Sequence, residues 1–240
     1  MFTYVYALLV GMVFGSFFMV IAMRVPVGES IITPRSHCHY CKYTLQPKEL
    51  IPIISFCMQK GRCTNCKRKI SILYTVFEFV TGSLFFLTVY VIGIEQELII
   101  ILSLFSLLLI ISVTDLVYML IPNRILIGFA FLLILECIFV PLVTWIDSIA
   151  GCGTIFILLY CVQRIYPEGL GGGDVKLLAL LGFVVGVKGS FMILFLSSCF
   201  SLCFFGIGIV LKRIEARKPI PFGPFISLGA ICYVLVTYSK

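Results

Sequence analysis

The chain has 240 residues, of which 61% are hydrophobic and only 12% are charged, and its formal net charge is +7. A soluble domain carries about 25% charged residues, so this composition excludes a water-soluble globular protein. The mean hydropathy of +1.15 agrees, because so much apolar surface needs lipid as its solvent.

The first apolar segment, residues 1–23, carries no charge, and the first cation is Arg24. A secretory signal peptide has its positive charge before the apolar run and a small-residue cleavage site after it. We therefore expect residues 1–23 to form a retained transmembrane helix.

Further apolar runs follow along the chain, and a helical span needs about 20 such residues. They predict an all-α polytopic membrane protein with about eight helices and tight hairpins at 93–97 and 188–189. The predicted domains are the first helix, a polar loop at 24–71 and a seven-helix membrane domain at 72–240. The expected spans are 2–23, 72–93, 98–114, 125–142, 146–163, 175–187, 190–211 and 221–238.

Lysine and arginine indicate the orientation of these spans. Eight spans place sixteen cations on one side of the membrane and only Lys188 and Lys240 on the other. The cation-rich side is the cytoplasmic side, so we expect both termini outside the cytosol and the 24–71 loop inside it. This topology, together with anionic lipid, accounts for the net charge, and no nucleic-acid partner is inferred.

The 24–71 loop contains two cysteine pairs of metal-binding spacing. Cys38 and Cys41 form one pair, and Cys63 and Cys66 form the other. Two such pairs suit a tetrahedral four-thiolate zinc site, which would be structural because no coordination position stays open. The remaining cysteines are Cys57, in the same loop, and six residues within apolar helices.

The alternative for these four cysteines is a pair of disulfides. Disulfides are rare in the reducing cytosol, so the predicted orientation favours metal. The neighbouring His37 and His39 are alternative ligands, and iron is an alternative metal. Because the loop has few apolar residues, metal binding would supply its folding energy.

Two aspartates are expected at matching depth near the cytosolic ends of their helices. Asp115 is 18 residues after Glu97, and Asp174 is 14 residues before Lys188, which correspond to about 27 and 21 Å of helix. Ionisable residues within spans are costly and mark functional sites. Asp115 and Asp174 are therefore the candidate catalytic pair of an aspartic protease, in which one carboxyl activates water and the other donates a proton.

The residues Gly171, Gly172 and Gly173 directly precede Asp174. They predict non-helical backbone without side chains, against which an extended substrate can lie. The alternative is an ordinary turn in which Asp174 caps the following helix.

Three further residues, Lys176, Pro122 and Glu78, are candidates for supporting roles. Lys176 is expected to contact the backbone or lipid phosphate, or to act on Asp174, and Pro122 shapes the exit of the helix that carries Asp115. Glu78 either pairs with a cation of the cysteine loop or lines the site. Glu136, in the middle of a span, has no partner that the sequence indicates.

Motifs spread along the whole chain resemble those of one family, the type IV prepilin peptidases. The matching segments are 15–26, 35–41, 61–66, 74–78, 115–122, 171–174 and 221–225. The resemblance implies removal of a short basic leader from prepilins or competence and secretion pseudopilins, at the cytosolic face of the bacterial cytoplasmic membrane. The cut typically follows a glycine, just before an apolar helix.

Many members of this family also N-methylate the new terminus, with S-adenosylmethionine as the cofactor. This chain departs from the family pattern at Met19, where Asn is common, and at His39, where Pro is usual. The sequence therefore leaves methylation open.

Three other functions remain alternatives. The two aspartates would also serve a proton- or cation-coupled transporter. A scaffold that docks partners through its zinc loop would not need them. A presenilin-like protease would accept helices without a basic leader.

Overall fold

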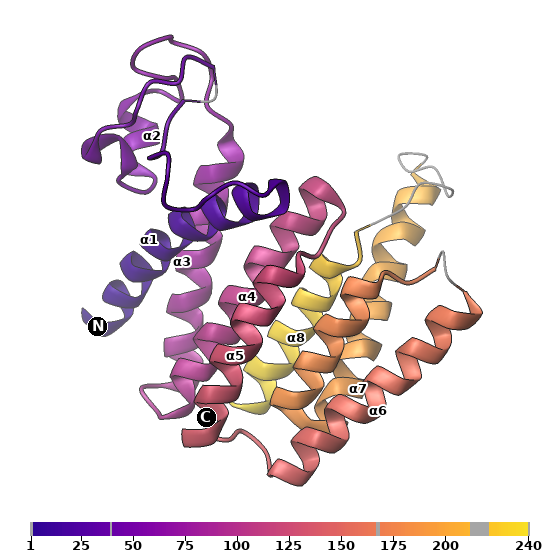
Figure 1. Cartoon of the computed structure of the whole chain (residues 1–240). Helices are drawn as coiled ribbons and strands as arrows, with labels where there is room; N and C mark the ends of the chain where they lie inside the picture. The colour runs from indigo at the N-terminus through magenta and orange to yellow at the C-terminus, as the bar shows by residue number, and fades with distance from the viewer. Residues whose placement is uncertain (1, 39, 167–168, 212–220, 240) are drawn as a thin grey trace. The chain divides into compact units, whose positions relative to one another are not determined.

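A computed structural model of the protein describes residues 2–38, 40–166, 169–211 and 221–239 (Figure 1). The candidate ligand His39 lies outside these residues, as do Lys212, Arg213, Arg217 and Lys218. The described chain is all-α, as predicted, and contains no β-strand. Its α-helices are α1 (Phe2–Arg24), α2 (Ile54–Met58), α3 (Ile72–Ile92), α4 (Glu97–Tyr118), α5 (Asn123–Phe139), α6 (Trp145–Ile165), α7 (Gly172–Val210) and α8 (Gly223–Thr237), with short 3-10 helices η1 (Val25–Val27) and η2 (Pro47–Leu50).

Several of the helices are suited to cross a membrane. By length and composition five described helices qualify, and α8 is a shorter apolar helix. Each of the eight predicted spans coincides with a helical segment, because α7 contains two of them. The protein is thus a multi-pass membrane protein. The five long segments are Phe2–Val27, Ile72–Ile92, Glu97–Tyr118, Trp145–Ile165 and Gly172–Gly208.

The first compact unit, Met1–Gly93, contains α1, α3 and the cysteine loop between them. Figure 1 shows α1 packed beside α3. A Cβ atom at Gly11 would lie 2.9 Å from the Cα of Gly82, so the two backbones approach closely. Small residues at such contacts let membrane helices associate through van der Waals packing.

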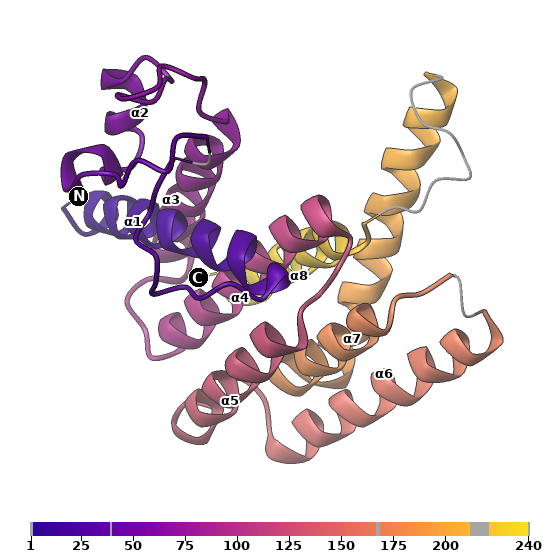
Figure 2. The same ribbon diagram turned by 45° about the horizontal axis from the view of Figure 1, so that its top comes forward.

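The second compact unit, Ile94–Lys240, contains α4 to α8. Within it, α8 packs on both α4 and α7, and α6 lies along α7 (Figure 2). The centre of this unit is formed by α4, whose residues from Ile100 to Asp115 are mostly buried.

The two halves of α7 meet at Gly186, whose φ of 77° is left-handed. The predicted hairpin at Lys188–Gly189 is therefore misplaced by two residues. Asp147 of α6 supplies the reason, because its Oδ1 accepts the Val187 N–H at 3.2 Å and so caps the second half. A side chain at position 186 would collide with this carboxylate, so glycine is required.

Gly151 of α6 lies close to the backbone of α7. A Cβ atom there would meet the Gly182 carbonyl oxygen and lie 2.6 Å from the carbonyl carbon of Gly186. By contrast, a Cβ atom at Gly153, two residues further along α6, would have no neighbour within 4 Å.

This contrast predicts opposite effects for the same substitution. Gly151→Ala should destabilise the protein by roughly 1–3 kcal/mol through overpacking. Gly153→Ala should stabilise it by roughly 0.5–1 kcal/mol, since alanine is favoured over glycine inside helices. Thermal unfolding in one detergent checks both, and equal midpoints for the two variants would contradict the close packing of α6 on α7.

Candidate active site and metal site

Asp115 lies three residues before the end of α4 and is buried. Its Oδ2 accepts a hydrogen bond of 2.7 Å from the N–H of Gly223, the first residue of α8. A Cβ atom at position 223 would stand 2.8 Å from this oxygen, so glycine permits the close approach. The free N–H groups at a helix N-terminus favour negative charge, so α8 holds and stabilises the Asp115 carboxylate.

Two serines, about one helical turn from the Asp115–Gly223 contact, form hydrogen bonds between α8 and α4. The Ser112 hydroxyl lies 2.8 Å from the Ser227 hydroxyl, and Ser227 also donates to the Leu108 carbonyl at 3.0 Å. Ser227 is buried. These bonds fix the position of α8 along α4 and therefore the position of Gly223 against Asp115. The predicted site did not include Gly223, Ser112 or Ser227.

Asp174 lies in the first turn of α7 and is also buried. Its backbone N–H donates to the Gly171 carbonyl at 3.1 Å, while its Oδ1 has no hydrogen-bond partner among the described residues. The Asp174 carboxyl is close enough to Asp115 for the two charges to interact. Buried polar atoms are nearly always hydrogen-bonded, so an enclosed oxygen without a partner marks a place for water or substrate.

Two of the three glycines before Asp174 differ from the prediction of irregular backbone, whereas Gly171 lies outside the helix. Gly172 and Gly173 are the first residues of α7 itself. A Cβ atom at Gly173 would lie 2.7 Å from Cβ of Ile121, and one at Gly171 would lie 2.9 Å from Oδ2 of Asp174. Gly173 therefore serves packing, because it lets the segment after α4 lie against the start of α7, whereas Gly171 leaves room beside the carboxylate.

The segment between α4 and α5 follows the helix that carries Asp115 and packs against the start of α7, which carries Asp174. Ile121 is buried against α7, and Pro122 precedes α5 with extended backbone. Lys176 donates to Oδ1 of Asn123 at 2.9 Å, which joins α7 to the start of α5. Lys176 thus contacts a side chain of the protein, and its contact with lipid stays a prediction.

The other two carboxyls within predicted spans have different surroundings. Glu78 belongs to the first unit, where its Oε2 accepts the Ile53 N–H of the cysteine loop at 2.9 Å. The expected pairing of Glu78 with a cation is thus replaced by a backbone contact. Oε1 of Glu136 accepts a hydrogen bond of 2.7 Å from Ser103 of α4, a partner that the sequence did not indicate, while its Oε2 is buried without a partner among the described residues.

The four predicted metal ligands come together in the first unit. The sulphur atoms of Cys38, Cys41, Cys63 and Cys66 all lie within 4.8 Å of one another. The Cys38–Cys66 and Cys41–Cys63 pairs are 3.8 and 3.9 Å apart, too far for disulfide bonds. Zn–S bonds of about 2.3 Å in a tetrahedron give S–S edges of about 3.8 Å, so the four thiols fit one tetrahedral ion.

The two cysteine pairs adopt the same backbone turn. Cys38 N–H donates to the Tyr43 carbonyl, and Cys63 N–H donates to the Arg68 carbonyl, both at 2.9 Å. The residue after each pair, Lys42 or Lys67, has a φ near 57°. Each pair therefore forms a separate knuckle that presents both of its sulphur atoms to one point.

Backbone N–H groups also form hydrogen bonds with Cys38, in the knuckle formed by Cys38 and Cys41. Those of Cys41 and then Tyr40 lower the pKa of Cys38 to about 6, because they stabilise its thiolate. His37 contacts the Arg35 carbonyl through Nδ1 at 2.9 Å and is not part of the four-sulphur cluster. These N–H groups thus favour the thiolate of Cys38, which is the metal-binding form of the side chain.

Fold and site together define a polytopic membrane protein with an enclosed aspartate pair and a four-cysteine loop. Residues 9–92 match the bacterial peptidase A24 N-terminal domain, and residues 102–206 match the type IV leader peptidase family. The chain is 41% identical over 221 residues to the prepilin leader peptidase/N-methyltransferase of Bacillus subtilis, covering 92% of this chain and 89% of that protein. The chain therefore belongs to the type IV leader peptidase family and is a peptidase.

More distant relatives also align along most of the chain. The type 4 prepilin-like proteins leader peptide-processing enzyme of Escherichia coli is 31% identical, over 93% of this chain and 90% of its own. The prepilin leader peptidase/N-methyltransferase of Pseudomonas putida is 27% identical, over 95% and 89%. No solved structure matches the chain. The gap between the two matched segments, residues 93–101, contains the boundary between the two compact units.

Proposed function

We propose that the protein is a membrane-embedded aspartic endopeptidase that removes the short basic leader of prepilins or of competence and secretion pseudopilins. The observation that carries this proposal is the enclosed, unpartnered Oδ1 of Asp174 beside Asp115. The names of the relatives, which describe prepilin leader processing, support the choice of substrate.

The proposed chemistry needs one proton shared between two neighbouring carboxyls. The ionised carboxyl takes a proton from a water molecule as its oxygen attacks the carbonyl carbon of the scissile peptide bond. The protonated carboxyl donates to the carbonyl oxygen and then helps to protonate the departing amine. The Gly223 N–H and the N-terminus of α8 support Asp115 in the ionised form, which leaves the unpartnered oxygen of Asp174 to face the substrate carbonyl.

The position of the pair suits a substrate that is partly in lipid and partly in water. Asp115 is near the end of α4 and Asp174 is at the start of α7, so both lie near the end of a membrane helix. A leader in the cytosol, followed by an apolar helix in the membrane, places its junction at this depth. Gly171 keeps the approach to Asp174 free of a side chain.

The distribution of lysine and arginine supports a defined orientation. We place the aspartates and the 24–71 loop at the cytosolic face of the bacterial cytoplasmic membrane, with both termini on the outer side, because cytoplasmic loops carry the excess of cations. The substrate leader is basic and cytosolic for the same reason.

We also propose that the four cysteines hold a structural zinc ion. The two knuckles suit a tetrahedral ion and leave no ligand position for substrate. Residues 24–71 would then form a metal-stabilised domain between the first helix and the membrane peptidase domain at 72–240.

The proposed function is tested with the purified full-length protein in liposomes. The substrate is a precursor with a basic leader, a glycine and an apolar helix, and the products are identified by mass spectrometry. We expect one cut, directly after the glycine. The absence of any cut by folded protein, or proton flux through it without a peptide product, would contradict the proposal. A mature product that is heavier by one methyl group when S-adenosylmethionine is supplied would add the second activity that several relatives' names contain.

The contact between Gly223 and Asp115 gives a separate prediction. Gly223→Ala places a methyl group against Oδ2 of Asp115, so it should displace the carboxylate and lower turnover by about 10²-fold. Gly128→Ala in α5 is the matched control, because its added Cβ would meet open space. Initial cleavage rates at saturating substrate check this, and equal rates for the two variants would show that α8 does not position Asp115.

A further inference from the structure

The cysteine loop carries the whole net charge of the protein. From Arg24 to Lys69 the chain contains nine cations and two acids, an excess of seven, whereas the rest of the chain contains nine of each. The loop begins where α1 ends and leads into α3, and both helices are long and apolar enough to span a membrane. This charge is therefore held at the membrane surface.

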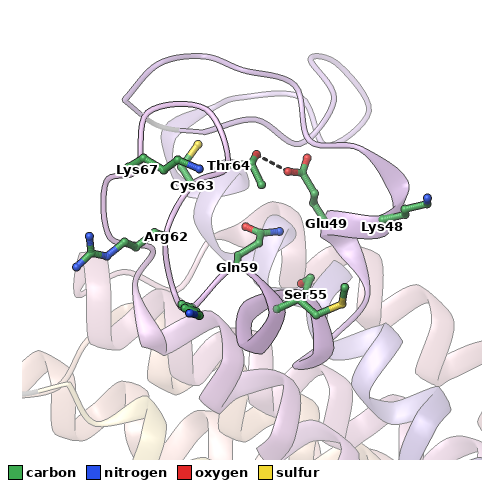
Figure 3. A pocket seen from close by; sticks show the side chains of 10 residues that line it. Lys48, Glu49, Ser55, Gln59, Arg62, Cys63, Thr64 and Lys67 are labelled. Atoms are coloured by element: carbon green, nitrogen blue, oxygen red, sulfur yellow. Dashed lines mark hydrogen bonds between the residues drawn. The ribbon is translucent and has the colours of Figure 1, made fainter.

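Part of this charge surrounds a hollow in the loop. The hollow has a volume of about 660 Å³, and its lining includes Lys48, Lys60, Arg62 and Lys67, all of them exposed. In Figure 3, Lys48 and Glu49 lie on one side of the hollow, and Arg62 and Lys67 lie on the other. The cations come from separate segments of the loop and share one cavity.

The acidic residue of this hollow, Glu49, already accepts hydrogen bonds from the loop through both of its carboxylate oxygens. Its Oε1 accepts the Thr64 hydroxyl, and its Oε2 accepts the Gln46 N–H at 2.7 Å. Within the described part of the chain, no salt bridge joins any of the four lysine and arginine side chains of the hollow to a carboxylate. The hollow thus offers several cationic donors to an anion.

The backbone holds the hollow close to the start of α3. Ile70 N–H donates to the Gly61 carbonyl at 2.8 Å, and the backbones of Arg62 and Lys69 form an isolated antiparallel β-bridge. Because Ile70 is two residues before α3, Lys60 and Arg62 are held within a few residues of a membrane helix. Two extended residues span about 7 Å, since each spans about 3.5 Å. This length is similar to the thickness of one headgroup layer, so the two cations lie at the level of the lipid headgroups.

Exposed apolar side chains accompany these cations. Ile54 and Met58 of α2 are 56% and 77% exposed, and Met58 itself lines the hollow. A surface that combines cations with exposed aliphatic side chains suits the membrane interface, where cations bind phosphates and apolar groups enter the acyl boundary. A free phosphate ion would make no use of the apolar residues.

We propose that this hollow of the cysteine loop binds the phosphate-bearing headgroup of an anionic membrane lipid, with Ile54 and Met58 inserted beside it. Such a lipid would anchor the loop on the membrane surface. The proposal concerns the loop alone and does not depend on peptidase activity.

The test uses full-length protein in a neutral detergent, with lipid binding followed by native mass spectrometry. Short-chain phosphatidylglycerol is titrated against short-chain phosphatidylcholine and inorganic phosphate. The double variant Lys60→Gln/Arg62→Gln removes two cations of the hollow. The double variant Arg164→Gln/Lys188→Gln is the control, because it removes the same charge from the second unit. Metal content and the thermal midpoint verify that each variant is folded.

We expect phosphatidylglycerol to bind more tightly than phosphatidylcholine or phosphate. The loop variant should bind it roughly 25-fold more weakly, or roughly fivefold per cation, whereas the control variant should bind like the wild type. Equal affinities for the two lipids, or equal losses in the two variants, would overturn the proposal. Phosphate binding as tight as that of phosphatidylglycerol would assign the hollow to a free anion and would also overturn it.

Discussion

We expect Asp115→Asn and Asp174→Asn each to lower the rate of leader cleavage by roughly 10²–10⁴-fold, the range that general acid–base catalysis contributes. Asparagine keeps the shape of aspartate, and at position 115 its carbonyl oxygen can still accept the Gly223 N–H. It cannot take a proton from water or share one with a neighbouring carboxyl. The measurement is the single-turnover rate with excess enzyme in liposomes.

Glu97→Gln is the matched control for this pair of variants, because it also neutralises a carboxylate of α4, in the first turn of the helix. It should cleave at the wild-type rate. All three variants should keep the wild-type unfolding temperature within a few degrees, since each replaces a carboxylate by an amide of the same shape. A folded Asp174→Asn protein that still cleaves its substrate would remove the proposed mechanism.

The second large effect is expected at the proposed metal site. Cys63 is 2% exposed and supplies one of the four clustered sulphur atoms, so Cys63→Ser should abolish tight metal binding and unfold the loop. Binding of structural zinc to small domains contributes about 10–16 kcal/mol, far more than this polar loop can recover from burial. The yield of folded protein should therefore fall more than the turnover of the molecules that do fold.

Cys57→Ser provides the comparison, because Cys57 is an exposed cysteine of the same loop outside the cluster. Metal analysis by plasma mass spectrometry and limited proteolysis of residues 24–71 report on the two variants. The wild type and Cys57→Ser should retain metal and resist the protease, whereas Cys63→Ser should lose both properties. Full metal content in Cys63→Ser would show that the four sulphur atoms do not form the site.

The helices were predictable because their signal lies within the chain itself. The length of an apolar run determines a span, so the expected segments 2–23 and 72–93 agree with α1 and α3 to within one residue at each end. The cysteine cluster was predictable for a similar reason. Each knuckle is a local turn of a few residues, and spacing alone brings its two sulphur atoms together.

The errors and omissions arise where a partner distant in the sequence decides the structure. The break in α7 was expected at Lys188–Gly189, where a charge interrupts the apolar run, but it lies at Gly186, where Asp147 of α6 caps the next helix. The start of α7 at Gly172 was expected to be irregular, yet Ile121 packs against it. Neither partner can be identified from local sequence pattern.

Gly223 is the most informative omission from the predicted site. The segment 221–225 was recognised as a family motif, but its contact with Asp115 joins residues that are 108 positions apart. A glycine and a proline at the start of a helix suggest only a helix N-terminus. The structure shows that the N–H of Gly223 donates to Oδ2 of Asp115. It therefore explains why a residue without a side chain is needed next to Asp115.

The most direct test of the aspartate pair uses a leader peptide whose scissile bond is replaced by a hydroxyl-bearing isostere of the water adduct. Its dissociation constant is measured for the wild type and for Asp174→Asn in the same liposomes. If the pair adds water to the peptide carbonyl, the isostere should bind the wild type at least about 10²-fold more tightly than the unmodified peptide, and this advantage should be lost in the variant. Equal binding of the isostere to the two proteins would contradict the assignment of catalysis to Asp115 and Asp174.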